Sequence, residues 1–73
     1  MARLLVISGR EACEILARHG FVEVRRRGSH IIMQKVVVGG TLTVPVPDHA
    51  ELRTGTLRAI IRQSGIARKE FEA

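Results

Sequence analysis

The sequence predicts an α+β fold in which a helix, a three-stranded antiparallel sheet and a second helix follow one another, with both helices on one face of the sheet. A capping-box pattern precedes an amphipathic stretch near the N-terminus, and a second amphipathic stretch ends at Gly65. Between them, three segments rich in strand-forming residues are separated by glycine-containing turns. At 73 residues the chain should form one domain, residues 1–73, too small for a deep cofactor pocket. No cofactor is therefore expected, and any active site should be shallow.

The first helix is expected to begin at the Ser-Gly-Arg-Glu motif of residues 8–11. There the serine hydroxyl and the glutamate carboxylate can satisfy opposite backbone donors at the helix start. Gly20 offers the left-handed conformation at which many helices end. His19, near this end, is expected to be structural, because a protonated imidazole is favoured at a helix C-terminus.

Three strands are expected over residues 21–27, 30–38 and 41–46. The pairs Gly28-Ser29 and Gly39-Gly40 between them predict two tight hairpins. If both are two-residue turns, the register is determined, and with it the side chains that share each face of the sheet.

On this register Arg27 pairs with His30, and Val38 pairs with Thr41. One face is almost purely aliphatic and should pack on the helices; it collects Val22, Val24, Ile31, Met33, Val37, Leu42, Val44 and Val46. Arg26 falls at its rim. The opposite, open face carries Arg25, Arg27, His30, Gln34, Thr41 and Thr43. It should also expose an aliphatic strip of Ile32, Val36 and Val38, and such a strip often indicates a protein partner.

The second helix is expected over residues 56–64, with Thr54 or Thr56 as its N-cap and Gly65 at its end. Its apolar face consists of Leu57, Ile60 and Ile61. The remaining residues, 66–73, are expected to add one short helical turn on which Phe71 docks.

The charge of the chain indicates a polyanionic partner. Twelve Lys and Arg against seven Asp and Glu leave a formal charge of +5, and ten of the twelve are arginine. Nucleic acid fits this excess best; an acidic protein partner, or a merely soluble basic protein, are the alternatives.

Several classes of protein are disfavoured. The lone Cys13 excludes an internal disulfide and is expected to be a small core residue. The histidines and this cysteine match no compact zinc-site spacing, so no metal is expected. No apolar run is long enough for a signal-peptide core or a membrane span, which predicts a cytoplasmic protein without a membrane partner.

The tripeptide Gly28-Ser29-His30 follows three consecutive arginines. An imidazole can take or give a proton near neutral pH, and arginines are suited to holding a phosphate. This combination predicts proton-transfer chemistry on a nucleic acid. The simpler interpretation is an ordinary hairpin turn followed by a polar surface residue.

Five short elements together resemble a known family, the HicA toxins, called YcfA-like in older descriptions. They are Ser8-Gly9, Gly20-Phe21, Arg27-Gly28-Ser29-His30, Val46-Pro47-Asp48-His49 and Gly55-Thr56-Leu57-Arg58. The resemblance covers nearly the whole chain. It implies a fold like that of double-stranded-RNA-binding domains, which agrees with the order of elements deduced above. It also implies the toxin of a type II toxin-antitoxin system, an endoribonuclease (mRNA interferase) that cleaves messenger RNA and is neutralised by a HicB-type antitoxin.

His30 matches the catalytic histidine of that family. It would act as general base on a ribose 2′-hydroxyl, which attacks the adjacent phosphorus without a metal, while arginines stabilise the added negative charge. His49 is the candidate for a second proton-transfer residue, although loop capping or simple exposure is the plainer interpretation. The residues expected to bind RNA are Arg25, Arg27, Ser29, Lys35, Arg58 and Arg62.

The sequence departs from the family pattern at one position, and two other functions remain as alternatives. Ile31 stands where many relatives carry a second histidine or an aromatic residue, which leaves His30 without an adjacent helper. The first rival is a non-catalytic RNA-binding module, which needs the arginines but not His30. The second is a protein-interaction domain that uses the exposed aliphatic strip and needs neither.

Overall fold

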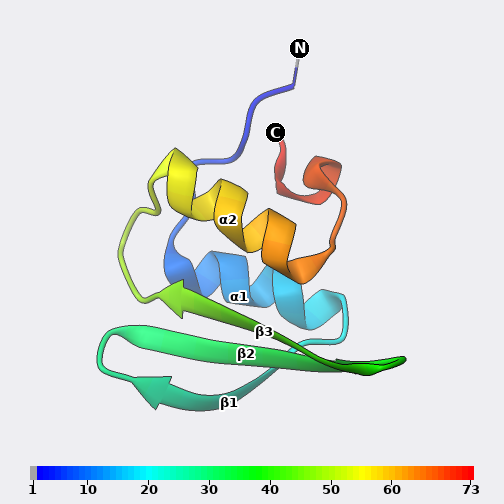
Figure 1. The fold of residues 1–73 in the computed structure, drawn as a ribbon. Helices are drawn as coiled ribbons and strands as arrows, with labels where there is room; N and C mark the ends of the chain where they lie inside the picture. The colour runs from blue at the N-terminus through cyan, green and yellow to red at the C-terminus, as the bar shows by residue number, and fades with distance from the viewer. Residues whose placement is uncertain (1) are drawn as a thin grey trace.

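The computed structural model describes residues 2–73 and contains the predicted helix, three strands and helix. The elements are α1 (Gly9–Arg18), β1 (Val22–Arg27), β2 (His30–Val37), β3 (Gly40–Pro47), α2 (Thr54–Ser64) and a short 3₁₀-helix, η1 (Arg68–Phe71). The strands form one antiparallel sheet in the order β1-β2-β3, and the helices and η1 lie together on one side of it (Figure 1). The predicted α+β fold is therefore confirmed. No helix of residues 2–73 is long and apolar enough to cross a membrane.

The start of α1 is set by the predicted capping box. The Glu11 backbone N–H donates to the Ser8 hydroxyl at 3.0 Å, and the Ser8 N–H donates to the Glu11 carboxylate at 2.9 Å. Gly20 follows the helix with a φ of 95°, the left-handed conformation expected there. His19 caps the C-terminus, and its Nε2 lies 3.3 Å from the Glu70 carboxylate of η1, in keeping with a structural role.

The first hairpin has the predicted turn, and Arg27 pairs with His30. Farther along β1 the register shifts between Glu23 and Arg25, where a β-bulge inserts one extra residue. Such an insertion reverses the alternation of side chains for the rest of the strand.

The bulge makes the prediction that Val22 and Val24 belong to the core wrong. Val22 is 61% exposed and Val24 is 42% exposed. Glu23 instead lies on the helix side of the sheet, opposite Met33, where its carboxylate is 3.8 Å from Arg10 of α1. An ion pair between α1 and β1 thus takes the place of the expected aliphatic contact.

The second hairpin turns at Val38 and Gly39, so Thr41 pairs with Val36 and not with Val38 as predicted. Gly39 has a φ of 89°, which identifies it as the turn glycine. The observed partner of Thr41 is two residues away from the predicted one. Because side chains alternate between faces along a strand, a shift of two residues leaves the side chains of β2 and β3 on their predicted faces. Val44 and Val46 are accordingly fully buried in the core.

The second helix begins earlier than predicted, at Thr54. Its N-cap is Arg53, so neither predicted threonine caps it; both belong to its first turn, and no side-chain hydrogen bond caps the helix within the described chain. Gly65 ends it in the left-handed conformation with a φ of 71°, as expected.

The C-terminal tail forms the predicted helical turn, and Phe71 is fully buried in it. The Leu5 N–H donates to the Phe71 carbonyl at 2.7 Å, and Leu4 bridges to Glu72. The two ends of the chain therefore run side by side (Figure 1).

One core joins the helices, the tail and the inner face of the sheet. It includes Leu16 of α1, Ile31, Met33, Val44 and Val46 of the sheet, Leu57 and Ile60 of α2, and both phenylalanines, Phe21 and Phe71. Cys13 is 9% exposed and belongs to the same cluster, as expected.

Alkylation of Cys13 is expected to be slow in the folded protein. Burial raises the pKa of its thiol from 9.0 to about 11, and the nearby Glu23 carboxylate adds to the rise. Near neutral pH this rise lowers the thiolate fraction of Cys13 roughly 100-fold compared with a thiol of pKa 9.0, and the thiolate is the reactive form. Iodoacetamide labelling followed by mass spectrometry at pH 7.5 should be fast only in urea, and Glu23→Gln should speed labelling of the native protein. Equal rates with and without urea would contradict the buried placement.

Candidate functional site

His30 is the first residue of β2 and projects exposed from the open face of the sheet. The turn before it contains Gly28, whose φ of 58° a side chain would disfavour. The Asp48 N–H donates to the Ser29 carbonyl at 2.7 Å and ties this turn to the loop after β3. The position of His30 therefore depends on a tight turn that is anchored by the loop after β3, at the same end of the sheet.

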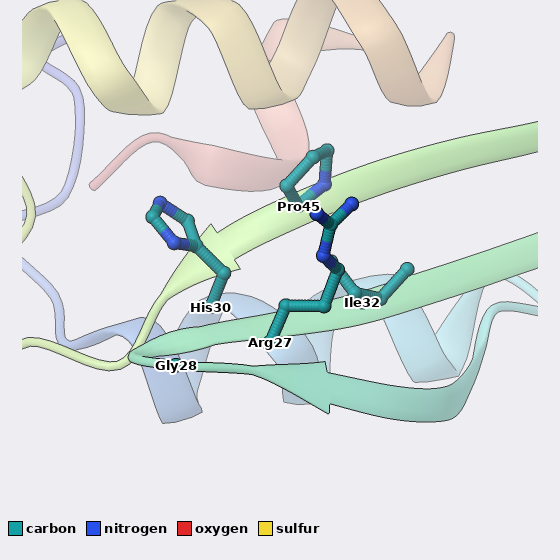
Figure 2. Close-up of a pocket in the computed structure, with 5 residues that line it drawn as sticks. All are labelled: Arg27, Gly28, His30, Ile32 and Pro45. Carbon is teal, nitrogen blue, oxygen red and sulfur yellow. The ribbon is translucent and has the colours of Figure 1, made fainter.

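A shallow hollow opens beside this histidine. Its lining consists of Arg27, Gly28, His30, Ile32 and Pro45. Figure 2 shows the side chains of Arg27 and His30 rising from the same face of the sheet. A guanidinium and an imidazole thus share one solvent-open depression, as the hairpin register predicts.

Ile32 differs from the sequence-based expectation. It lies on the open face but is only 5% exposed, so it does not belong to an exposed aliphatic strip. It pairs with Arg25 on one side and Pro45 on the other, and these open-face neighbours leave it little contact with solvent. Val36 and Val38, at 84% and 105% exposed, are the members of the strip that do face solvent.

A second hollow adjoins the first at His30. It is lined by His30, Pro45 and Pro47 from the sheet and by Gly55, Thr56, Ala59, Ile60 and Gln63 from α2. The first-turn N–H groups of α2 have no intrahelical partner, and the N-terminus of a helix carries a partial positive charge. The imidazole therefore lies where an arginine-lined hollow meets a hollow next to a helix N-terminus.

The three consecutive arginines have different surroundings. Arg26 points to the helix side of the sheet, and its Nη1 lies 2.9 Å from the Asp48 carboxylate, which also lies 3.7 Å from Arg10. Arg25 and Arg27 face the open side, and neither takes part in an ion pair within residues 2–73. Of these two, Arg27 lines the hollow with His30, whereas Arg25 lies two residues earlier in β1 and pairs with Ile32.

The remaining basic residues predicted to bind RNA lie elsewhere. Lys35 is on the helix side of the sheet, with its Nζ 5.9 Å from the centre of the Phe21 ring. Arg58 and Arg62 are exposed on α2. Neither lines the second hollow, to which α2 contributes Gly55, Thr56, Ala59, Ile60 and Gln63. The structure thus brings Arg27 to His30 but does not bring these three.

His49 and Ser29 each accept a backbone hydrogen bond through their carbonyl groups. The His49 carbonyl accepts a hydrogen bond from the Gly9 N–H at 2.9 Å, and its exposed side chain is outside the described lining of both hollows. Ser29 is exposed in the turn, where its carbonyl holds Asp48. The structure does not bring His49 into the hollows at His30.

Sequence reasoning missed the contribution of α2 and of the two prolines. Gly55 and Ala59 are small residues four apart on one side of α2, and they leave the space that forms the second hollow. The signal was present in the Gly55-Thr56 pair, which predicts the start of a helix and belongs to the family resemblance but was not assigned to the site. Pro45 alternates with the buried Val44 and Val46, and this alternation alone places it on the open face.

Gly9 was also missed as a residue that shapes the site. A Cβ built on it would lie 1.9 Å from the carbonyl oxygen of Pro47, the residue that pairs with His30. The start of α1 therefore touches the end of β3 through backbone atoms alone.

Comparison with known protein families matches residues 9–66 to the HicA toxin of bacterial toxin-antitoxin systems. The matched segment contains α1, the sheet, α2 and every residue that lines the two hollows. It ends before η1. A search of curated proteins found no match to the chain.

Proposed function

From the premise that the chain belongs to the HicA toxin family of bacterial toxin-antitoxin systems, we propose that it is a metal-independent endoribonuclease that cleaves messenger RNA. The observation that carries the proposal is the placement of His30. This exposed imidazole lies at the junction of two hollows, next to an arginine without an ion pair among the described residues. The proposed substrate places the toxin in the cytoplasm, where messenger RNA is found.

His30 is the proposed general base. One ring nitrogen of the neutral imidazole accepts the proton of a ribose 2′-hydroxyl, and the resulting oxyanion attacks the adjacent phosphorus. The bond from phosphorus to the 5′-oxygen breaks, and that oxygen takes a proton from solvent. The products are a 2′,3′-cyclic phosphate and a 5′-hydroxyl. DNA lacks the nucleophile and is therefore not cut.

Arg27 is the proposed electrostatic partner. Its guanidinium lines the same hollow as the imidazole, so it can donate to phosphate oxygens whose charge grows as the 2′-oxygen attacks. Arg25 extends the positive charge along the strand. The N-terminus of α2 faces the second hollow and favours a neighbouring phosphate of the same strand. Arg58 and Arg62 would contact RNA only if it wrapped around α2, and Lys35 only on the opposite side of the sheet.

RNA affinity is expected to come from phosphate contacts. Phe21 and Phe71 are the only aromatic residues of the chain, and both are buried. No phenylalanine, tyrosine or tryptophan side chain is thus available for stacking on bases, and sequence selectivity should be weak.

The antitoxin partner that the family implies is proposed to be of the HicB type. Contact with the open face would cover His30 and Arg27 and block access of RNA to both hollows. Open-face residues Arg25 and Arg27 offer charge for such a contact, since neither has an ion pair within residues 2–73.

The proposal is tested by incubating the purified protein with a long RNA in excess EDTA and analysing the fragment ends. We expect cleavage that leaves 2′,3′-cyclic phosphates, because the mechanism needs no metal. A 2′-deoxyribose at the cleaved position should abolish cutting there, since it removes the nucleophile. Intact RNA that is nevertheless bound by the protein would favour the non-catalytic RNA-binding module. Cleavage that stops in EDTA would contradict the metal-independent mechanism.

A further inference from the structure

The free edge of the sheet is a feature that RNA cleavage does not use. Within residues 2–73, β1 pairs with β2 alone, and no element covers its outer side (Figure 1). The other edge strand, β3, packs against α2. An edge strand leaves alternate backbone N–H and C=O groups unpaired, so β1 can accept a further strand.

A groove runs beneath this edge, between β1 and α1, on the side of the sheet opposite His30. Its apolar lining includes Cys13 and Ala17 of α1 together with Phe21 and Met33. Glu14 and Glu23 contribute carboxylates to the same groove, and Arg10 contributes a guanidinium that lies 3.8 Å from the Glu23 carboxylate. An apolar side chain from an added strand could enter it, whereas an acidic one would meet a groove with one carboxylate in excess over its guanidinium.

On the open-face side of β1, acidic side chains of an added strand would be favoured. Arg25 and Arg27 are exposed on the open face, and no carboxylate of residues 2–73 pairs with them. An added strand that placed acidic side chains on this side would neutralise both guanidiniums. Because side chains of a strand alternate between faces, one extended segment can meet both requirements.

From these observations we propose that the edge of β1 receives an extended segment of a protein partner. The carboxylates of the segment face Arg25 and Arg27, and its intervening apolar side chains enter the groove beside α1. This is strand addition, in which main-chain hydrogen bonds supply affinity and alternate side chains supply specificity. A second copy of this chain is a poor occupant, since antiparallel pairing of two complete β1 strands would set Val22 against Arg27 and Val24 against Arg25 and so bring no carboxylate to either guanidinium. The inference does not depend on RNA cleavage.

The test uses a synthetic peptide of roughly eight residues, a usual strand length, with alternating aspartate and valine and blocked ends. Its binding to the full chain is measured by calorimetry and by amide hydrogen exchange. We expect new protection of amides in β1 and none in β3. The same peptide with alternate nitrogens methylated keeps its charge but loses half of its backbone donors, and it should bind about tenfold more weakly or worse.

Matched variants locate the surface. Removing two charges with Arg25→Gln and Arg27→Gln should weaken binding about tenfold, whereas the same change at Arg58 and Arg62 on α2 should leave it nearly unchanged. Ala17→Phe fills the groove from an exposed helical position and should also weaken binding.

Four results would overturn the proposal. Equal binding of the methylated peptide, or equal losses in the two double variants, would mean that only net charge is recognised. A dimer of the free chain in sedimentation, with β1 amides protected, would make a second copy the occupant. Absence of peptide binding at millimolar concentration would mean that the bulge and the arginines only prevent β1 from pairing with another strand.

Discussion

His30→Ala is expected to abolish detectable RNA cleavage while the protein remains folded and still binds RNA. A positioned general base contributes about 10²–10⁴-fold to a rate, and no other described histidine lines the hollows. The side chain is exposed, so its removal leaves no cavity in the core. Cleavage rate, thermal unfolding and RNA binding at fixed salt should be measured on the same preparations.

Two further measurements separate a chemical role from a structural one. The hollow is open to solvent, so added imidazole should partly restore cleavage by His30→Ala, which a merely structural histidine would not allow. His49→Ala tests the other proposed proton-transfer position. Full activity of His49→Ala would leave His30 as the only one of these two histidines that is required, and a loss equal to that of His30→Ala would establish a pair. Unchanged cleavage by His30→Ala would contradict the proposed mechanism altogether.

Gly9→Ala is expected to destabilise the fold strongly, although it changes one hydrogen to a methyl group. The added Cβ would lie 1.9 Å from the Pro47 carbonyl oxygen and 3.2 Å from the Asp48 Cα, both backbone atoms. These neighbours cannot rotate aside, so α1 or the end of β3 must move. The cost should reach the upper end of the about 1–3 kcal/mol usual for overpacking. Urea unfolding followed by circular dichroism measures it.

Gly55→Ala is the matched control, since Gly55 also lies in the first turn of a helix. A Cβ there would meet no atom within 4 Å, and its φ is not positive. Alanine should therefore stabilise α2 by about 0.5–1 kcal/mol. Equal effects of the two substitutions would contradict the close approach of Gly9 to Pro47. Because Pro47 pairs with His30, Gly9→Ala should also lower the cleavage rate of the fraction that remains folded.

The chain by itself determined the features whose causes are local. The capping box joins residues three apart, and Gly65 ends α2 through its own backbone conformation. The turn at Gly28 sets the pairing of Arg27 with His30, and that pairing puts both on the open face. These elements could be predicted because each depends on a few neighbouring residues.

The tertiary structure alone decided what depends on residues far apart in the chain. The bulge near Val24 turns Glu23 toward Arg10, and nothing within β1 signals that ion pair. The second hollow exists because α2 packs beside β3 and brings Gly55 and Ala59 to His30. The closeness of Gly9 to Pro47 likewise joins two segments nearly forty residues apart. Local patterns specify turns and helix ends, whereas the packing of distant segments selects among registers and shapes the surface around the imidazole.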